Sequence, residues 1–426
     1  METLIKNIQL LEKDNTLIPG ALWLKDGRIH AIGTSFPEEN FAEVIDGHHY
    51  LATPGFVDVH VHLREPGFTY KEKIATGSKA AARGGYTTIC AMPNLNPVPD
   101  TPERLKDVLA RNKQDGVVKI LQYAPITTGL KSEELVDMAA LKALGAFAFT
   151  NDGVGVQTAG TMYLAMKKAA EVGLALVAHT EDNSLLFGGV MHEGHKNKEL
   201  GLPGILGVTE SSQIARDIML AEATGVHYHV CHVSTKESVR VIRDAKNAGI
   251  HVTCEVTPHH LLLDEEDITK DHGYFKMNPP LRGTDDHQAL IDGLLDGTID
   301  CIATDHAPHG HEEKNQSMLK APFGITGSET AFSLLYTKFV KTGVFTLQQL
   351  VDWLTVKPAA IFSLDAGTLN LGRPADLTLI DLATSRTIKD TDYVSMADNT
   401  PFTGSKIYGQ PMMTFVDGQM VYKEEA

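Results

Sequence analysis

The chain of 426 residues contains few cysteines, fewer basic than acidic residues and no long apolar run. Its four cysteines lack the Cys-x-x-Cys spacing of zinc and redox motifs, and each lies in an apolar, β-branched segment. We therefore expect buried, reduced thiols and a cytoplasmic protein. The 38 basic residues are outnumbered by 54 acidic ones, and the net charge of −16 argues against nucleic acid or an anionic membrane as the main partner. A small anionic substrate stays compatible, because one local arginine can override the global field.

Membrane and export signals are also missing from the sequence. No segment approaches the roughly 18 apolar residues of a membrane-spanning helix. The N-terminal METLIKNIQLLEKDN has no basic segment leading into an apolar one, as a signal peptide would. The length and the 42% hydrophobic content allow one large barrel or two to three ordinary domains.

Both ends of the chain read as β-structure. Short apolar stretches alternate with glycine-containing turns over residues 1–52, and the same texture returns in residues 365–426. Asp26-Gly27 and Asp417-Gly418 lie between such stretches and are typical of hairpin turns. The sequence predicts that the two ends combine into one small β-sandwich domain.

Residues 53–364 alternate β-like runs with helix-like ones. The expected strands are 56–62, 87–92, 118–124, 145–150, 175–179, 227–232, 251–256 and 300–305. The segment 235–249 illustrates the helices, since it puts Val239, Ile242 and Ala245 on one face. Eight such units predict an α/β fold, a (β/α)8 TIM-like barrel, with a doubly wound open sheet as the alternative. The insertion 181–209 is expected to cover the active face.

The segment Asp58-Val59-His60-Val61-His62-Leu63-Arg64 follows an apolar run and carries chemistry. Alternate strand residues share one face, so His60 and His62 would present two imidazoles to one metal, with Arg64 as a cation nearby. The pattern alone is weak, because roughly 0.8 His-x-His pairs are expected by chance at this histidine content. Its weight depends on other strand ends supplying further ligands.

The active site of a (β/α)8 barrel lies at the C-terminal ends of its strands. The expected ends carry, in chain order, His60, His62, Asn94, Asp152, His179, His232 and Asp305. Each has an ordinary alternative: a structural histidine, a turn residue or a helix cap. His227 and His229 compete with His232 but have the opposite strand parity. Four histidines and two aspartates together favour divalent zinc, with cobalt or manganese as substitutes, and two metals sharing a bridging carboxylate could use all six.

A set of motifs spread over nearly the whole chain resembles the amidohydrolase superfamily. They are DVHVHLREPG (58–67), CAMPN (90–94), FTNDG (149–153), VAHTED (177–182), CHVST (231–235), TPHH (257–260), MNPPLR (277–282), ATDHAPH (303–309), APFG (321–324) and the terminal GRPADLTLID. Within the superfamily, the set most closely resembles the dihydroorotases of the bacterial class I type.

This resemblance implies roles for individual residues. His60, His62 and Asp305 would bind one Zn²⁺, His179 and His232 a second. Asp152 would bridge both, where many relatives use a carboxylated lysine. Asp305 would also be the catalytic proton carrier. The implied substrate-binding residues are His62, Arg64, Asn94, Asn278, His309, Phe323 and Gly324. His306 and His259 are given supporting roles at most. The family commonly has Asp at the position of Asn151, a departure that could change local charge or metal retention.

The implied function is a zinc-dependent, reversible cyclisation of N-carbamoyl-L-aspartate to L-dihydroorotate in pyrimidine (UMP) biosynthesis. One alternative is another cyclic amidase, a hydantoinase/dihydropyrimidinase or an allantoinase, whose typical substrates lack the ring carboxylate and need no arginine at position 64. The other is a non-catalytic scaffold, which would typically lose metal ligands. Segment 309–324 is a candidate lid over the substrate. The sequence leaves open a homodimer and an association with other pyrimidine-pathway enzymes.

Overall fold

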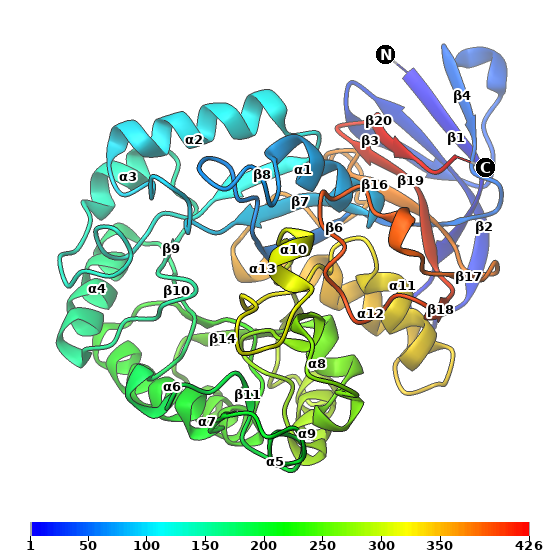
Figure 1. Cartoon of the computed structure of the whole chain (residues 1–426). Coiled ribbons are helices and arrows are strands. Elements are labelled where there is room, and N and C mark those ends of the chain that lie inside the picture. The colour runs from blue at the N-terminus through cyan, green and yellow to red at the C-terminus, as the bar shows by residue number, and fades with distance from the viewer. Residues whose placement is uncertain (1, 426) are drawn as a thin grey trace.

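The computed structural model describes residues 2–425 and contains a ring of strands and helices beside a β-sheet (Figure 1). The sheet has eight strands in the order β20-β19-β16-β5-β1-β2-β3, with β4 paired to β1. Their bounds are β1 Glu2–Leu11, β2 Leu17–Lys25, β3 Arg28–Gly33, β4 Glu43–Asp46, β5 Leu51–Pro54, β16 Leu377–Asp381, β19 Gln410–Val416 and β20 Gln419–Lys423. The antiparallel pairing of β5 with β16 joins the two ends of the chain.

This sheet curves back on itself into a sandwich. Leu22 and Leu24 of β2 share one buried cluster with Met413 and Phe415 of β19, although these strands lie far apart in the sheet order. Both predicted hairpin turns are confirmed: residues 26–27 join β2 to β3, and residues 417–418 join β19 to β20. All four turn residues have positive φ, as a type I′ turn requires.

The middle of the chain forms eight parallel strands. They are β6 Phe56–Val61, β7 Tyr86–Ala91, β8 Lys119–Gln122, β9 Phe149–Thr150, β10 Leu176–Ala178, β13 Tyr228–Val230, β14 Val252–Val256 and β15 Cys301–Ile302. They pair in chain order within two sheets, β6-β7-β8 and β9-β10-β13-β14-β15. Parallel bridges Ala124–Phe149 and Val61–His306 join these sheets at both edges. The ring is therefore closed, and the predicted barrel is confirmed over the open sheet.

Helices follow the barrel strands, and α1 to α4, α6 and α7 lie on the outside of the ring (Figure 1). Their bounds are α1 Ile74–Arg83, α2 Pro102–Asp115, α3 Met138–Leu144, α4 Ala159–Val172, α6 Val208–Thr224, α7 Lys236–Asn247, α8 Pro258–Leu262, α9 Thr284–Leu295, α10 His311–Lys314, α11 Ala331–Leu335, α12 Leu347–Leu354 and α13 Val356–Ile361. The bounds and the buried face of helix α7 agree with the helix predicted over 235–249. Thr235 caps its start by accepting a hydrogen bond from the Ser238 amide, and Val239, Ile242 and Ala245 are buried.

Several barrel strands are shorter than the sequence predicts, and the difference is largest for β9 and β15, each four residues shorter. Strand β9 is two residues long, because Gly145 ends α3 with a φ of 109° instead of opening the strand. Strand β15 ends at Ile302, and Asp305 lies beyond it with a φ of 48°. The insertion 181–209 contains two short strands, β11 Met191–His192 and β12 Gly204–Ile205, around helix α5 Lys196–Leu200. Strands β17 Arg386–Thr387 and β18 Lys406–Ile407 form a small separate ribbon.

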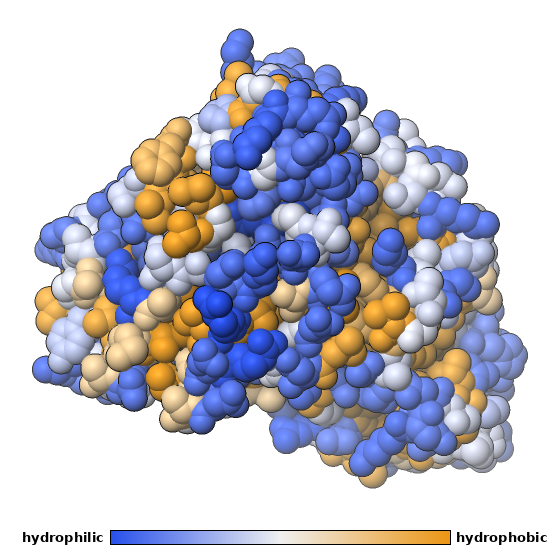
Figure 2. All heavy atoms as spheres, turned by 90° about the horizontal axis from the view of Figure 1, so that it is seen from below, coloured by the Kyte–Doolittle hydropathy of each residue, from blue (hydrophilic) through white to orange (hydrophobic). Residues whose placement is uncertain are grey.

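The barrel interior is filled with apolar side chains below its C-terminal mouth. Val57, Val59, Tyr123 and Val177 belong to this inner cluster. The four cysteines are all free and buried, as predicted. Within residues 2–425, no helix combines the length and apolar character that crossing a membrane requires. On the face drawn in Figure 2, hydrophilic residues cover much of the surface and apolar residues form patches between them.

Candidate active site

The six predicted metal ligands meet at the C-terminal mouth of the barrel, and all six are buried. His60 Nε2, at the end of β6, lies 3.3 Å from Asp152 Oδ1 and 3.3 Å from Asp305 Oδ1. His62 Nε2 lies 3.0 Å from Asp305 Oδ1 and 3.5 Å from Asp152 Oδ2. Residues from the first, fourth and eighth barrel strands therefore share one cluster.

The fifth and sixth strands complete the cluster. His179 Nδ1 and His232 Nε2 are 2.9 Å apart, and each lies 3.9 Å from Asp152 Oδ1. Asp152 is thus central, with four imidazoles around one carboxylate. Two sets of donor atoms lie within 4.8 Å of one another: His60, His232 and Asp305, and Asp152, His179 and His232.

Glu255 on β14 determines which nitrogen of His60 faces the cluster. Its Oε1 atom lies 2.7 Å from His60 Nδ1, so the Nδ1–H group donates to this carboxylate. The opposite atom, Nε2, faces Asp152 and Asp305. Among the described residues, neither this nitrogen nor Asp152 Oδ1 has a hydrogen-bond partner. A positive charge between Nε2 and the two carboxylates, either a proton on Nε2 or a metal ion, would satisfy all three groups. These nitrogen and oxygen donors fit a divalent metal such as zinc.

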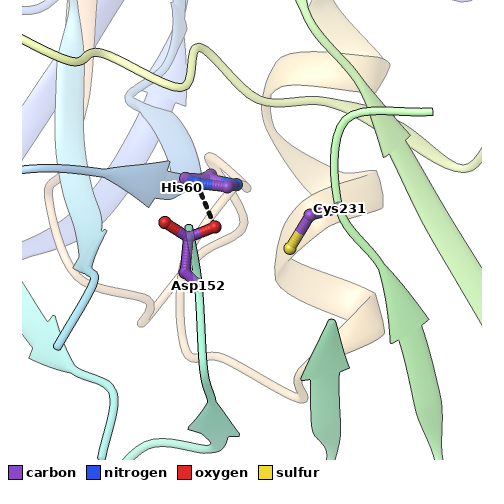
Figure 3. Close-up of side chains that lie close together, drawn as sticks. All are labelled: His60, Asp152 and Cys231. Carbon is purple, nitrogen blue, oxygen red and sulfur yellow. Dashed lines mark ion pairs between the residues drawn. The ribbon is translucent and has the colours of Figure 1, made fainter. Parts of the chain in front are cut away.

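Cys231 lies beside the same cluster. Its sulfur is within 4.8 Å of donor atoms of His60 and Asp152, which form the ion pair drawn in Figure 3. The sequence analysis predicted only that Cys231 is a buried thiol and did not predict that it lies near the candidate metal ligands. Burial and the nearby Glu255 carboxylate raise the pKa of the Cys231 thiol, which favours the protonated form.

The cluster is strongly coupled electrostatically. Burial would raise the pKa of Asp152 and of Asp305, but His60 and neighbouring histidines hold both below the usual range. Burial would lower the pKa of His60, yet the surrounding carboxylates raise it well above the usual value. Burial and two neighbouring imidazoles lower the pKa of His232 to about 3. His232 is therefore neutral near pH 7, the form that binds metals.

Three residues at the mouth have an uncommon backbone conformation. Arg64, His232 and Asp305 have φ values of 61°, 33° and 48°. Non-glycine residues rarely adopt this left-handed region, and those that do cluster at functional sites. Here the conformation turns each chain segment at the mouth of the barrel.

A cavity of about 180 Å³ opens beside the cluster. All seven predicted substrate-binding residues line it: His62, Arg64, Asn94, Asn278, His309, Phe323 and Gly324. Asn94 Oδ1 is 3.0 Å from His62 Nδ1, and Asn94 Nδ2 donates to Asp152 Oδ2 at 3.3 Å. One side chain therefore connects the cavity with the carboxylate at the centre of the cluster.

Arg64 is the cation of this cavity. Its Nε donates to Pro308 O at 3.1 Å, and its Nη2 lies 3.3 Å from His309 Nε2. Within residues 2–425 no carboxylate forms an ion pair with Arg64. A guanidinium that lines a cavity without a carboxylate partner is suited to bind an anionic ligand.

Two carboxylates near the site escaped the sequence reasoning. Glu181 accepts a hydrogen bond from Asn278 Nδ2 at 2.5 Å, and its Oε2 is 3.8 Å from His179 Nε2. Glu255 contacts His60 as described. The signal for Glu255 was an acidic residue inside the apolar strand Val252–Val256, where an unpaired charge would be costly.

Other histidines lie outside the cavity. His306 Nδ1 accepts hydrogen bonds from the amides of Gly327 and Ser328, and His259 is buried against His260. Asn151 is turned toward a different loop. Its Oδ1 accepts from the amides of residues 126 and 127, and its Nδ2 donates to Thr127 Oγ1 and Leu130 O.

The closed barrel, the β-sandwich and a histidine–aspartate cluster at the strand ends define a cyclic amide hydrolase of the amidohydrolase type. Two solved structures share this architecture. The L-hydantoinase (dihydropyrimidinase) from Arthrobacter aurescens is 25% identical, covers 100% of this chain and 97% of its own, and superposes with a TM-score of 0.88. The D-hydantoinase (dihydropyrimidinase) from Thermus sp. is 26% identical, with the same coverage and a TM-score of 0.84.

Sequence comparisons separate this chain from those neighbours. A family model described as dihydro-orotase-like matches residues 50–238. Dihydroorotases from Enterococcus faecalis and Ligilactobacillus salivarius are 69% and 62% identical, each over 100% of both chains. The dihydroorotase of Staphylococcus aureus is 60% identical over 99% of both chains. The chain belongs to the dihydroorotase family.

Proposed function

We propose that this chain catalyses the reversible cyclisation of N-carbamoyl-L-aspartate to L-dihydroorotate, a step of pyrimidine biosynthesis. Arg64 carries the proposal, because its guanidinium, which has no carboxylate partner among residues 2–425, lines the cavity beside the buried histidine–aspartate cluster. The substrate has a ring carboxylate that Arg64 would bind through two parallel hydrogen bonds. The identity of 60% or more to dihydroorotases over the full length supports the same activity.

The proposed metal site holds two Zn²⁺ ions. His60, His62 and Asp305 would bind one and His179 and His232 the other, with Asp152 as the bridging ligand. The central position of Asp152, with four imidazoles around it, supports this division. Bound zinc would polarise the ring amide carbonyl and lower the pKa of a water molecule.

The protein side chains would position the substrate and move one proton. Arg64, Asn94 and His309 would hold the carboxylate, while Asn278 and the backbone at residues 323–324 would contact the ring. In hydrolysis, the oxygen of water adds to the carbonyl carbon and the bond to the ring nitrogen breaks. Asp305 would accept the water proton and give it to that nitrogen, and cyclisation reverses these steps. The neighbouring histidines hold the pKa of Asp305 below its usual range, so Asp305 is ionised before the reaction.

The structural neighbours raise the alternative of a hydantoinase or dihydropyrimidinase. Two observations weigh against it: Arg64 lines the cavity, and the fourth strand supplies Asp152 rather than a lysine. A scaffold without activity is disfavoured because all six ligand residues are retained and buried together.

The proposal extends to organisation and location. We assign residues 1–52 and 365–426 to a β domain and residues 53–364 to the catalytic barrel. A cytoplasmic location suits the four reduced cysteines. Segment 309–324 is the proposed lid, since its two ends, His309 and Gly324, both line the cavity.

The decisive experiment measures dihydroorotate hydrolysis by the purified, zinc-loaded protein, with dihydrouracil and hydantoin as competing substrates. We expect turnover of dihydroorotate, its loss after chelation and its return with Zn²⁺. Preferred turnover of dihydrouracil would refute the proposal.

A further inference from the structure

Glu255 is a charged residue inside the barrel that takes no part in the proposed reaction. Its side chain is fully buried, and it does not line the cavity. A buried carboxylate is costly unless it is paired and hydrogen-bonded. Its contacts therefore indicate what it does.

The carboxylate joins two of the proposed metal ligands. Oε1 lies 2.7 Å from His60 Nδ1 and accepts a hydrogen bond from the backbone amide of His232 at 3.3 Å. Oε2 lies 3.2 Å from Nε2 of His229, which is itself fully buried. One side chain on β14 thus contacts residues on β6 and β13.

A line of polar groups continues below Glu255 toward the opposite end of the barrel. His229 Nδ1 and His227 Nε2 each lie 2.8 Å from Thr253 Oγ1. The ring of His227 stacks on His251 with centroids 4.2 Å apart. His229 and Thr253 are paired in register on the adjacent strands β13 and β14, and His227 and His251 immediately precede these strands.

Only one assignment of donors and acceptors satisfies every hydrogen bond of this line. A hydroxyl has a single proton, so Thr253 donates to one histidine and accepts from the other. Because Glu255 needs a donor from His229 Nε2, His229 Nδ1 accepts a hydrogen bond from the Thr253 hydroxyl. His227 Nε2–H then donates to Thr253. Each polar group of the line then has a partner, and the Nδ1–H group of His60 is directed at Glu255, which leaves Nε2 pointing at the cluster.

We infer that Glu255 is a positioning residue for metal binding by His60, held in place by His229 and Thr253. This inference rests on the proposed metal site. Partners that orient a ligating histidine typically contribute 10–100-fold to metal affinity. Glu255 acts through His60 and does not contact the substrate cavity.

The test compares Zn²⁺ affinity, measured by competition with a chromophoric chelator, in the full-length protein and in Glu255→Gln. We expect binding about 10–100-fold weaker in the variant, and a changed visible absorption spectrum when Co²⁺ is bound. Glu329→Gln is the matched control, because Glu329 is also a buried carboxylate, and it is bonded to Arg83 and two backbone amides. It should keep the wild-type metal affinity and spectrum.

Thr253→Val removes the hydroxyl that contacts His229, the histidine next to Glu255 in the line, and keeps the shape of the side chain. We expect weaker Zn²⁺ binding in the same direction, by a smaller factor than for Glu255→Gln. This variant also serves if Glu255→Gln fails to fold. Wild-type affinity and Co²⁺ spectrum in folded Glu255→Gln or Thr253→Val would overturn the inference. Failure of the wild-type protein to bind Zn²⁺ would instead refute the proposed metal site.

Discussion

Arg64 and His309 lie side by side in the lining of the cavity, with two hydrogen-bond donors in contact. Arg64 Nη2 is 3.3 Å from His309 Nε2, which also lies 2.8 Å from Phe323 O. The carbonyl requires the proton on Nε2. Nδ1 then accepts a hydrogen bond from Lys71 Nζ at 3.0 Å, and the Glu313 carboxylate, 3.1 Å from Nδ1, pairs with the same lysine at 3.1 Å. Neither nitrogen can accept from the other. The pair therefore presents positive electrostatic potential to the cavity and favours an anionic ligand.

Arg64→Ala should reduce kcat/KM for dihydroorotate by about 10–100-fold, because one charged hydrogen bond contributes roughly 1.5–3 kcal/mol. Steady-state kinetics measures the loss. Arg64→Lys keeps the charge without the paired N–H groups, so it should recover only part of the activity. Unchanged turnover of dihydroorotate in Arg64→Ala would contradict the role assigned to this residue.

Asp305→Asn should lower kcat by roughly 10²–10⁴-fold, since an amide cannot accept the proton. Substrate affinity should change less, because Asp305 does not hold the ring carboxylate. Ligand titration followed by single-turnover measurement separates binding from chemistry. Zn²⁺ content must be determined in parallel, and a variant that has lost its metal would not test proton transfer. Near-normal kcat with full metal content would exclude Asp305 as the proton carrier.

The sequence predicted the fold well because the information is local. Apolar runs such as that before His60 end in polar residues, so strand ends can be read directly. Glu255 was missed because its contact with His60 spans 195 residues and follows from barrel closure alone. Strand lengths were overestimated where the backbone leaves β geometry, as at Asp305. The local sequence pattern locates the strand ends, but the contacts between residues on different strands depend on the tertiary structure.

Asn151→Asp should lower the free energy of unfolding by about 1–3 kcal/mol. A carboxylate cannot donate, so Leu130 O would lose its hydrogen bond from Nδ2 and would face a negative charge. The new charge would also adjoin Asp152. Chemical denaturation measures the loss of stability. Asn151→Ser serves as a comparison that removes the amide without adding charge, and equal stability of the Asp variant and wild type would contradict the prediction.

Lys314→Met should loosen the proposed lid. Lys314 is fully buried in segment 309–324, and its Nζ donates to Lys276 O and Pro322 O at 2.9 Å each. Methionine preserves the apolar stem but removes both bonds. We expect faster proteolysis within the segment and a higher KM, with substrate analogue protecting the wild-type segment more than the variant. Lys320→Met, at an exposed position of the same segment, is the control. Equal cleavage rates with and without ligand would argue against a lid.

Asp217 gives the chain a pH-dependent stability away from the active site. It is fully buried, accepts hydrogen bonds from Arg216 Nε and the Tyr228 hydroxyl, and burial raises its pKa to about 6. The folded state therefore binds this proton more tightly than the unfolded state, whose pKa is near 3.8. The stability contribution is present below about pH 4 and is lost as the pH rises to about 6.

Asp217→Asn removes the titrating group and keeps its shape. The stability difference, variant minus wild type, should shift in favour of the variant by roughly 3 kcal/mol between pH 4 and pH 7, since a shift of about two pKa units corresponds to that energy. The stability difference at any one pH also includes the effect of the altered hydrogen bond to Arg216. Only the change of this difference with pH therefore tests the prediction. Thermal unfolding across this range measures it, with Asp107→Asn on the exposed face of α2 as the control. A difference that stays constant with pH would show that Asp217 is ionised in the folded protein throughout this range.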